Sequence, residues 1–158
     1  MKKLFATVLV FAMVLCMFAG CNSGSNGGSE RIKIGGIGPL TGGAAIYGNA
    51  VKNAMEIAVE EVNAKGGVQF ELNFQDDAHD AESSVNAYGI LMDWGMQVLV
   101  GPVTSTPAAA VAPEAEADGV FMLTPSASSV KVIENKTHVF QMCFSDPNQG
   151  VGAADYMS

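Results

Sequence analysis

An alternation of strand-like and helix-like segments constrains the fold of this chain more than any other feature. Short apolar runs at residues 32–38, 68–74, 96–101, 120–124 and 138–144 predict strands. Most of these runs are apolar throughout, which is typical of strands that are buried in a parallel sheet. Since helical patterns lie between them, we expect an α/β fold with a doubly wound parallel sheet and helices on both faces.

The segments between the strands carry helix signals at their ends. Helices are expected over residues 48–65, 80–94 and 107–118, with a further one from 146 onward. Asp80 is expected to cap the second helix, and Thr106 followed by Pro107 is expected to cap and begin the third. Pro113 lies inside the third helix, where we expect it to kink or restart the helix.

The glycine-rich stretch GIGPLTG at residues 36–42 follows the first predicted strand, where open α/β sheets bind their ligands. Its glycine spacing, G-x-G-x-x-x-G, differs from the dinucleotide fingerprint G-x-G-x-x-G. Pro39 also removes a backbone N–H group that a phosphate cradle needs. The stretch is therefore expected to line a pocket for a small molecule other than a nucleotide.

The N-terminus predicts export from the cell. Lys2 and Lys3 precede an uninterrupted apolar run at residues 4–19, which is short of the about 20 residues that span a bilayer. A basic start, an apolar run and then small residues form the export-signal pattern. We expect residues 1–20 to be a signal peptide.

The end of this signal resembles that of bacterial lipoproteins. Ala19 and Gly20 stand directly before Cys21, at the position where a lipoprotein signal is cut and the cysteine receives lipid. The alternative is a plain secretory signal with an incidental cysteine. We expect lipidation of Cys21, followed by a flexible linker through residue 30, because residues 22–29 contain only Gly, Ser and Asn.

The charge and the sparse functional groups exclude several classes of protein. The formal net charge is −8, and removal of the signal takes away two lysines, so a nucleic-acid partner is not expected. Cys143 is the only cysteine beyond Cys21, and no metal-ligand spacing, nucleophile elbow or Walker motif is present. We expect no metal, no cofactor and no catalytic residue.

The ordered motifs of the chain resemble a known family. They are IKIGGIGPLTGGAAIYGNAVKNAMEIAVEEVNAKGGV, then QDDAHDAESSV, VGPVTSTPAAAVAPEAEADGV and LTPSASS. Together they are similar to the type I periplasmic binding proteins, in the branch typified by the leucine/isoleucine/valine-binding proteins of ABC importers. The resemblance implies an N-terminal ligand-binding lobe at residues 31–145 and the start of a crossover to a second lobe at residues 146–158. It also implies that the chain is truncated to about half the family length.

The resemblance also implies roles for five residues. Ser105 and Thr106 would hold an amino-acid carboxylate. Ser126 would offer its backbone carbonyl to the ligand's ammonium group, Ser128 would offer its hydroxyl to the same end of the ligand, and Tyr47 would wall the pocket. Without the resemblance, the better interpretation of the serines and the threonine is as helix caps and turn residues, and that of Tyr47 is as packing for the first helix.

The function implied is that of the solute-binding component of an ABC importer, which is not an enzyme. It would close on a branched-chain or similar amino acid, or a small carboxylate, and deliver it to a membrane permease. The protein would be lipid-anchored at the outer face of the cytoplasmic membrane, and monomeric when full length. The alternatives are the ligand-sensing module of a receptor, an extracellular enzyme and a non-functional truncated remnant.

The intact mass of the mature protein, recovered from the membranes of its own cell, tests the lipid anchor. We expect a lipidated species whose first residue is Cys21. An unmodified mass, or a different first residue, would contradict lipidation.

Overall fold

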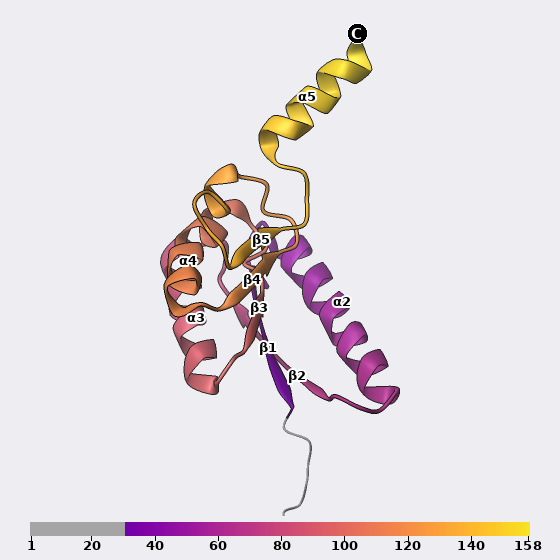
Figure 1. Ribbon diagram of the computed structural model, residues 1–158, viewed down its shortest axis with the longest axis vertical. Coiled ribbons are helices and arrows are strands. Elements are labelled where there is room, and N and C mark those ends of the chain that lie inside the picture. The colour runs from indigo at the N-terminus through magenta and orange to yellow at the C-terminus, as the bar shows by residue number, and fades with distance from the viewer. Residues whose placement is uncertain (1–30) are drawn as a thin grey trace, which may run out of the picture. The chain divides into compact units, whose positions relative to one another are not determined.

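The computed structural model describes residues 31–158, which form a parallel sheet with helices on both of its faces (Figure 1). The predicted signal peptide, Cys21 and the linker lie outside the described residues. The strands are β1 (Ile32–Gly38), β2 (Phe70–Asp76), β3 (Val98–Val100), β4 (Phe121–Thr124) and β5 (Val139–Gln141). The helices are α2 (Ala45–Ala64), α3 (Ala81–Trp94), α4 (Ser105–Asp118) and α5 (Asp146–Met157), with a 3₁₀ helix, η1 (Val130–Val132).

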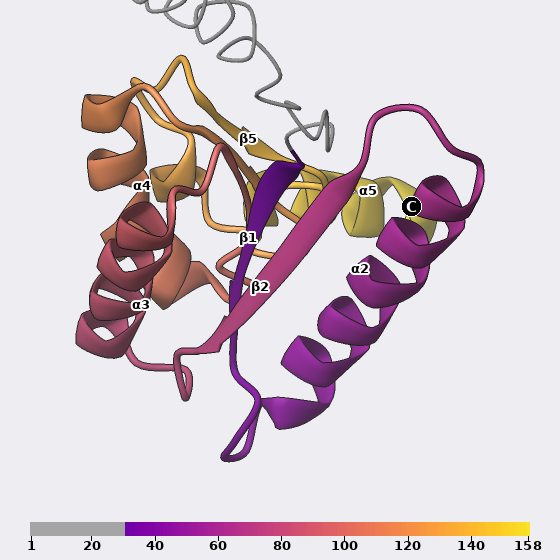
Figure 2. The same ribbon diagram turned by 90° about the horizontal axis from the view of Figure 1, so that it is seen from below.

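The order of the strands defines the type of sheet. It is β2-β1-β3-β4-β5, and every neighbouring pair is parallel. The helix α2 lies on one face, whereas α3 and α4 lie on the other (Figure 2). The predicted doubly wound α/β fold is thus confirmed. Because all strands point the same way, the loops that follow them emerge together at the carboxyl edge of the sheet, where open α/β sheets bind ligands.

The predicted elements are found close to their expected positions, and the third helix carries the main correction. Thr106 is not its N-cap, because α4 begins at Ser105 with Thr104 in the cap position. Pro107 therefore lies in the first turn, where its missing N–H would have had no partner within the helix. The predicted restart at Pro113 is also wrong, since α4 continues through this residue as one helix.

One face of the sheet carries the core. Leu99, Met122 and Val139, on three neighbouring strands, are at most 3% exposed. They form one cluster with buried side chains of α3 and α4. The residues that these two helices contribute with full burial are Leu91, Ala108, Val111, Ala112 and Ala115. The small alanines let α4 lie close against the strands, which places the start of this helix firmly beside the carboxyl edge.

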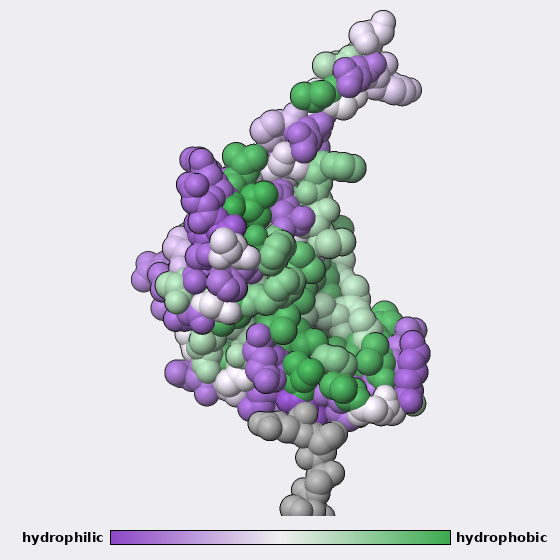
Figure 3. Space-filling model, in the orientation of Figure 1, coloured by the Kyte–Doolittle hydropathy of each residue, from purple (hydrophilic) through white to green (hydrophobic). Residues whose placement is uncertain are grey.

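The opposite face is apolar as well but is only partly covered. Phe121 and Phe140 point to this side, are 43% and 45% exposed, and stack with their ring centroids 5.1 Å apart. Figure 3 shows apolar side chains gathered between α2 and the layer of α3 and α4. A hollow of about 150 Å³ lies where α2 meets β1 and β2. Its lining is formed by Ile34, Ala58, Val59, Val62 and Phe70.

The difference between the two faces predicts unequal losses of stability at adjacent residues of β4. Met122→Ala should lower the free energy of unfolding by about 2–5 kcal/mol, because it leaves a cavity in the core. Phe121→Ala should cost less than about 1.5 kcal/mol, because nearly half of the ring is already in water. Urea unfolding of the full chain and both variants measures the difference. Equal losses would show that both faces are buried alike.

The loop after β2 holds the glycine-rich loop in place through Asp76. Its Oδ1 accepts hydrogen bonds from Leu40 N at 2.7 Å and Ala78 N at 2.8 Å, and its Oδ2 accepts one from Thr41 Oγ1 at 2.7 Å. Partial desolvation opposes the charged carboxylate, but these hydrogen bonds outweigh it and lower the pKa of Asp76. The charged form of Asp76 is therefore part of the loop structure.

The pKa of the neighbouring Asp77 is shifted in the opposite direction. It is fully buried, its Oδ1 accepts a hydrogen bond from His79 N at 2.9 Å, and its Oδ2 has no partner within the described residues. Desolvation by burial therefore raises the pKa of Asp77, and the nearby charge of Asp76 adds to the effect.

These two carboxyl groups predict opposite pH dependences of stability. A carboxyl group whose pKa is lowered by folding stabilises the fold at pH values above the ordinary carboxyl pKa. This contribution is lost as the pH falls. A raised pKa contributes stability at low pH that is lost as the pH rises. Between about pH 3 and pH 7, the natural chain should therefore gain stability relative to Asp76→Asn and lose stability relative to Asp77→Asn. Urea unfolding across this range measures both trends, and parallel trends would contradict the assignment.

Candidate functional site

The candidate site lies where α4 begins, at the carboxyl edge of the sheet. Thr104 occupies the cap position without a capping hydrogen bond from its side chain, and its Oγ1 lies 2.9 Å from Nδ1 of His79. This contact ties the loop after β2 to the start of α4. The backbone N–H groups of Ser105 and Thr106, in the first turn, have no acceptor within the helix. They present partial positive charge, which favours an anion.

The hydroxyl of Ser105 joins α4 to the loop that follows β4. Its Oγ accepts hydrogen bonds from Ser128 N at 3.1 Å and Ser129 N at 3.3 Å. A serine hydroxyl has two acceptor positions and one donor. Both acceptor positions are filled here, and the donor has no partner within residues 31–158. The Ser105 hydroxyl is therefore left as a hydrogen-bond donor, which is the group that a carboxylate needs.

The two other predicted serines lie in the loop that Ser105 holds. Ser126 donates its hydroxyl to Val103 O at 2.6 Å, so its side chain is used within the fold. Its backbone carbonyl accepts no hydrogen bond from the described part of the chain. The carbonyl of Ser128 accepts a hydrogen bond from Asp146 N at 2.9 Å, at the start of α5, whereas its hydroxyl has no partner in the same region. The loop thus offers one acceptor and one hydroxyl.

The far end of α4 is fixed by Glu116. Its carboxylate accepts hydrogen bonds from the backbone N–H and hydroxyl of Thr137 and from the backbone N–H of His138, at 2.7–3.0 Å. The bond from the Thr137 hydroxyl contributes most, and together these donors lower the pKa of Glu116 to about 2. The carboxylate is therefore charged at neutral pH and holds α4 to the start of β5.

A hollow of about 290 Å³ opens beside the start of α4. It is lined by Ser105, Thr106, Ala109, Ser129 and Lys131. Two of the predicted residues, Ser105 and Thr106, therefore share this space with a lysine of η1. Among the described residues of the lining, Lys131 is the only one with a charged side chain, so they present hydroxyl groups and one positive charge.

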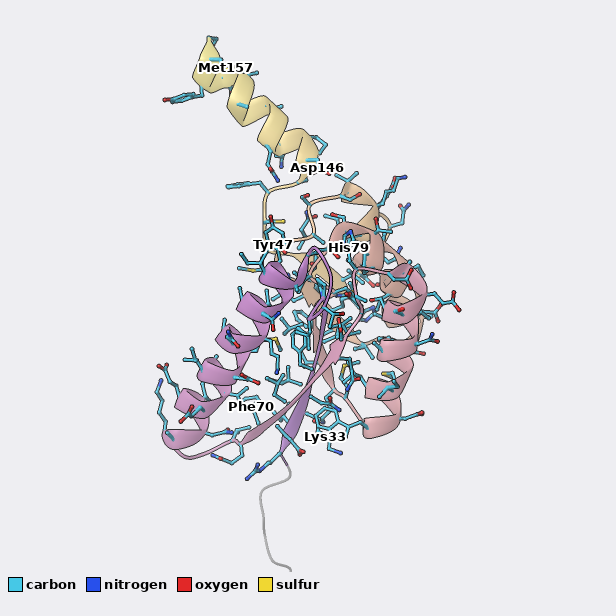
Figure 4. All side chains as sticks on the ribbon, turned by 180° about the vertical axis from the view of Figure 1, so that it is seen from behind. Lys33, Tyr47, Phe70, His79, Asp146 and Met157 are labelled. Carbon is cyan, nitrogen blue, oxygen red and sulfur yellow. The ribbon has the colours of Figure 1, made fainter. Side chains whose placement is uncertain are left out.

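Tyr47 is not joined to the serines. It lies near the start of α2 and is 62% exposed. Figure 4 shows Tyr47 and His79 at the same end of the sheet, opposite the end that carries Lys33 and Phe70. Tyr47 therefore shares the carboxyl edge with the site, but no hydrogen bond links its side chain to Ser105, Ser126 or Ser128 within the described residues.

Two further findings concern residues 31–158. In this region no three His, Cys, Asp or Glu side chains come close enough together to hold a metal ion. Nor does any helix of the same region have the length and apolar character needed to cross a membrane.

The sequence reasoning missed Lys131 and the role of His79. Lys131 lies in a single 3₁₀ turn, where no helical or strand periodicity shows which way a side chain points. The side chain of His79 is exposed, but its hydrogen bond to Thr104 connects two loops. A lone histidine carries no spacing signal that could have predicted this contact.

Comparison with known proteins identifies the family. The family described as "Periplasmic binding protein" matches residues 31–158. The Leu/Ile/Val-binding protein BraC3 of Rhizobium johnstonii is 39% identical over 130 residues, which cover 80% of this chain and 35% of that protein. The leucine-, isoleucine-, valine-, threonine- and alanine-binding protein of Pseudomonas aeruginosa is 30% identical over 162 residues, covering 100% of this chain and 41% of that protein.

Solved structures agree with this assignment. The leucine-binding protein LivK of Thermotoga maritima superposes with a TM-score of 0.73 at 32% identity, covering 79% of this chain and 36% of that chain. The substrate-binding protein LivJ of Streptococcus pneumoniae, solved in complex with isoleucine, has a TM-score of 0.70 at 29% identity, covering 74% and 35%.

The chain spans about a third of the length of the curated relatives it matches, 35% for the first two. The match nevertheless includes all of the described residues, the sheet and the loops of the candidate site. The predicted resemblance is confirmed, and the chain belongs to the periplasmic binding protein family.

Proposed function

We propose that this chain forms the amino-terminal part of the solute-binding component of an ABC importer, and that it binds an amino acid or a related small carboxylate without turning it over. The observation that carries the proposal is the hydroxyl of Ser105. Its two acceptor positions are filled by the loop after β4, which leaves its proton for donation to a ligand. The names of the relatives, which are binding proteins for amino acids, support the ligand class.

The carboxylate of the ligand binds at the start of α4. The Ser105 hydroxyl and the free first-turn N–H groups of Ser105 and Thr106 donate to its oxygens. Hydrogen bonds to a charged acceptor are roughly twice as strong as those between neutral groups. The helix dipole adds to the attraction, because the N-terminus of α4 carries partial positive charge.

The ammonium group of the ligand binds to the loop after β4. The backbone carbonyl of Ser126 and the hydroxyl of Ser128 accept hydrogen bonds from it, since neither is used as an acceptor within the described residues. Tyr47, at the same edge of the sheet, covers the ligand from the side of α2. No group of this constellation activates a nucleophile or a water molecule, which fits binding without catalysis.

The partners of the binding component follow from the same proposal. Residues 31–145 form one ligand-binding lobe, and residues 146–158 lead toward the remainder of a two-lobed protein that closes on its ligand by a hinge. The closed protein delivers the ligand to a membrane permease. A signal peptide at residues 1–20 and a lipid on Cys21 place a monomeric protein at the outer face of the cytoplasmic membrane.

Ser105→Ala tests the carboxylate donor. Loss of a hydrogen bond to a charged group costs about 1.5–3 kcal/mol, so the dissociation constant for an amino acid should rise at least about tenfold. Calorimetric titration of the full chain with L-leucine, L-isoleucine and L-glutamate, beginning with the natural sequence, measures the change. Ser128→Ala should weaken binding less, because its hydroxyl meets the ligand together with the Ser126 carbonyl.

Ser158→Ala is the matched control, because it removes a serine hydroxyl at the chain end that bonds only to Asp155 O. It should leave the dissociation constant unchanged. Binding that survives in Ser105→Ala with undiminished strength would refute this site. Turnover of the ligand by the natural chain would refute the proposal of a non-enzymatic binding protein.

A further inference from the structure

The hollow beside α4 differs in character from the loop that carries Ser126 and Ser128. Neither of these two residues lines the hollow, whereas Ser105 and Thr106 do. The start of α4 therefore borders two regions. One is the loop after β4, with its free carbonyl and hydroxyl, and the other is the hollow, which continues along α4 to Ala109 and across to Lys131.

Within residues 31–158, the ammonium group of Lys131 has no partner in this hollow. The ion pairs within residues 31–158 are Lys52 with Glu56, and His138 with Glu116, and neither involves Lys131. No hydrogen bond within the same residues uses its ammonium group. The chain is strongly acidic, with 16 Asp and Glu against 8 Lys and Arg. A lysine beside the site therefore gives this region a positive charge that differs in sign from the net charge of the chain.

The other groups in the hollow suit an anion as well. The hydroxyls of Thr106 and Ser129 can both donate, and Ala109 leaves room because its side chain is small. No carboxylate that would compete for Lys131 is present among the described residues of the lining. A hollow of about 290 Å³ also exceeds what a single carboxylate fills, since one water molecule takes up only about 30 Å³ in the liquid.

We infer that the ligand carries a second anionic group, which enters this hollow and pairs with Lys131. This inference rests on the proposed function, because the first carboxylate and the ammonium group occupy the start of α4 and the loop after β4. It narrows the ligand class from amino acids in general to those with an acidic side chain, or to dicarboxylates of similar length. Lys131 would then determine specificity.

A comparison of L-glutamate with L-glutamine tests this inference, because the two ligands have nearly the same shape and differ in one negative charge. Calorimetric titration of the full chain should give a dissociation constant for L-glutamate roughly three- to tenfold lower than for L-glutamine, as expected for a partly exposed charge pair. Increasing the salt concentration from about 0.05 M to 0.5 M should reduce this preference through screening.

Variants assign the preference to the lysine. Lys131→Gln should bring the ratio of the two dissociation constants close to one, and Lys131→Arg should retain most of the preference. Lys136→Gln is the matched control, since it removes the same charge from a nearby lysine that does not line the hollow. It should leave the ratio as in the natural chain. Far-ultraviolet circular dichroism of each variant confirms that the fold is kept.

The outcomes separate this inference from the proposed function. If L-leucine or L-glutamine binds as tightly as L-glutamate, the second anionic group is refuted while amino-acid binding stands. An unchanged preference in Lys131→Gln would refute the role of the lysine. If none of the three amino acids binds, the proposed function fails and the inference fails with it.

Discussion

The sheet is organised around β1, which pairs with β2 on one side and with β3 on the other, so that the strand order reverses at this strand. Ile34 and Gly36 are aligned with β2 on one side and with β3 on the other. Since crossovers between parallel strands are right-handed, the reversal sends α2 to one face and α3 and α4 to the other. The loops at the carboxyl edge therefore diverge around β1, and the start of α4 is left accessible between them.

The polar donors and acceptors that remain available at the candidate site are those that make no hydrogen bond within the fold. The Ser126 hydroxyl donates to Val103 O, and the Thr104 hydroxyl is hydrogen-bonded to Nδ1 of His79, so both hydroxyls are engaged within the fold. Ser105 is different, because the fold uses both of its acceptor positions and leaves its donor. Within residues 31–158, the bonds that these loops have already made thus leave a hydroxyl donor at the start of α4.

Much of the fold could be predicted from the sequence, because the apolar strands and the helix cap at Asp80 are local signals. The predicted cap is confirmed, since Asp80 Oδ1 accepts a hydrogen bond from Ser83 N. The start of α4 at Ser105 could not be predicted from the sequence, because a proline such as Pro107 is tolerated at several positions of the first helical turn. The family resemblance predicts Ser105 and Ser128 in one ligand site, and the structure shows a hydrogen bond from Ser128 N to Ser105 Oγ. Lys131 could not be predicted, because its direction depends on one 3₁₀ turn and on packing between elements distant in sequence.

The Ser105 hydroxyl also begins a short relay of hydrogen bonds. Ser128 donates its N–H to Ser105 Oγ, and its carbonyl receives the N–H of Asp146, the first residue of α5. None of the residues of α5 is buried, so the direction of this helix is set mainly by the contacts at its first residue, Asp146. With 12 residues at about 1.5 Å rise each, α5 is a lever roughly 18 Å long. Any rotation of the chain at Asp146 therefore displaces the far end of α5 in proportion to this length.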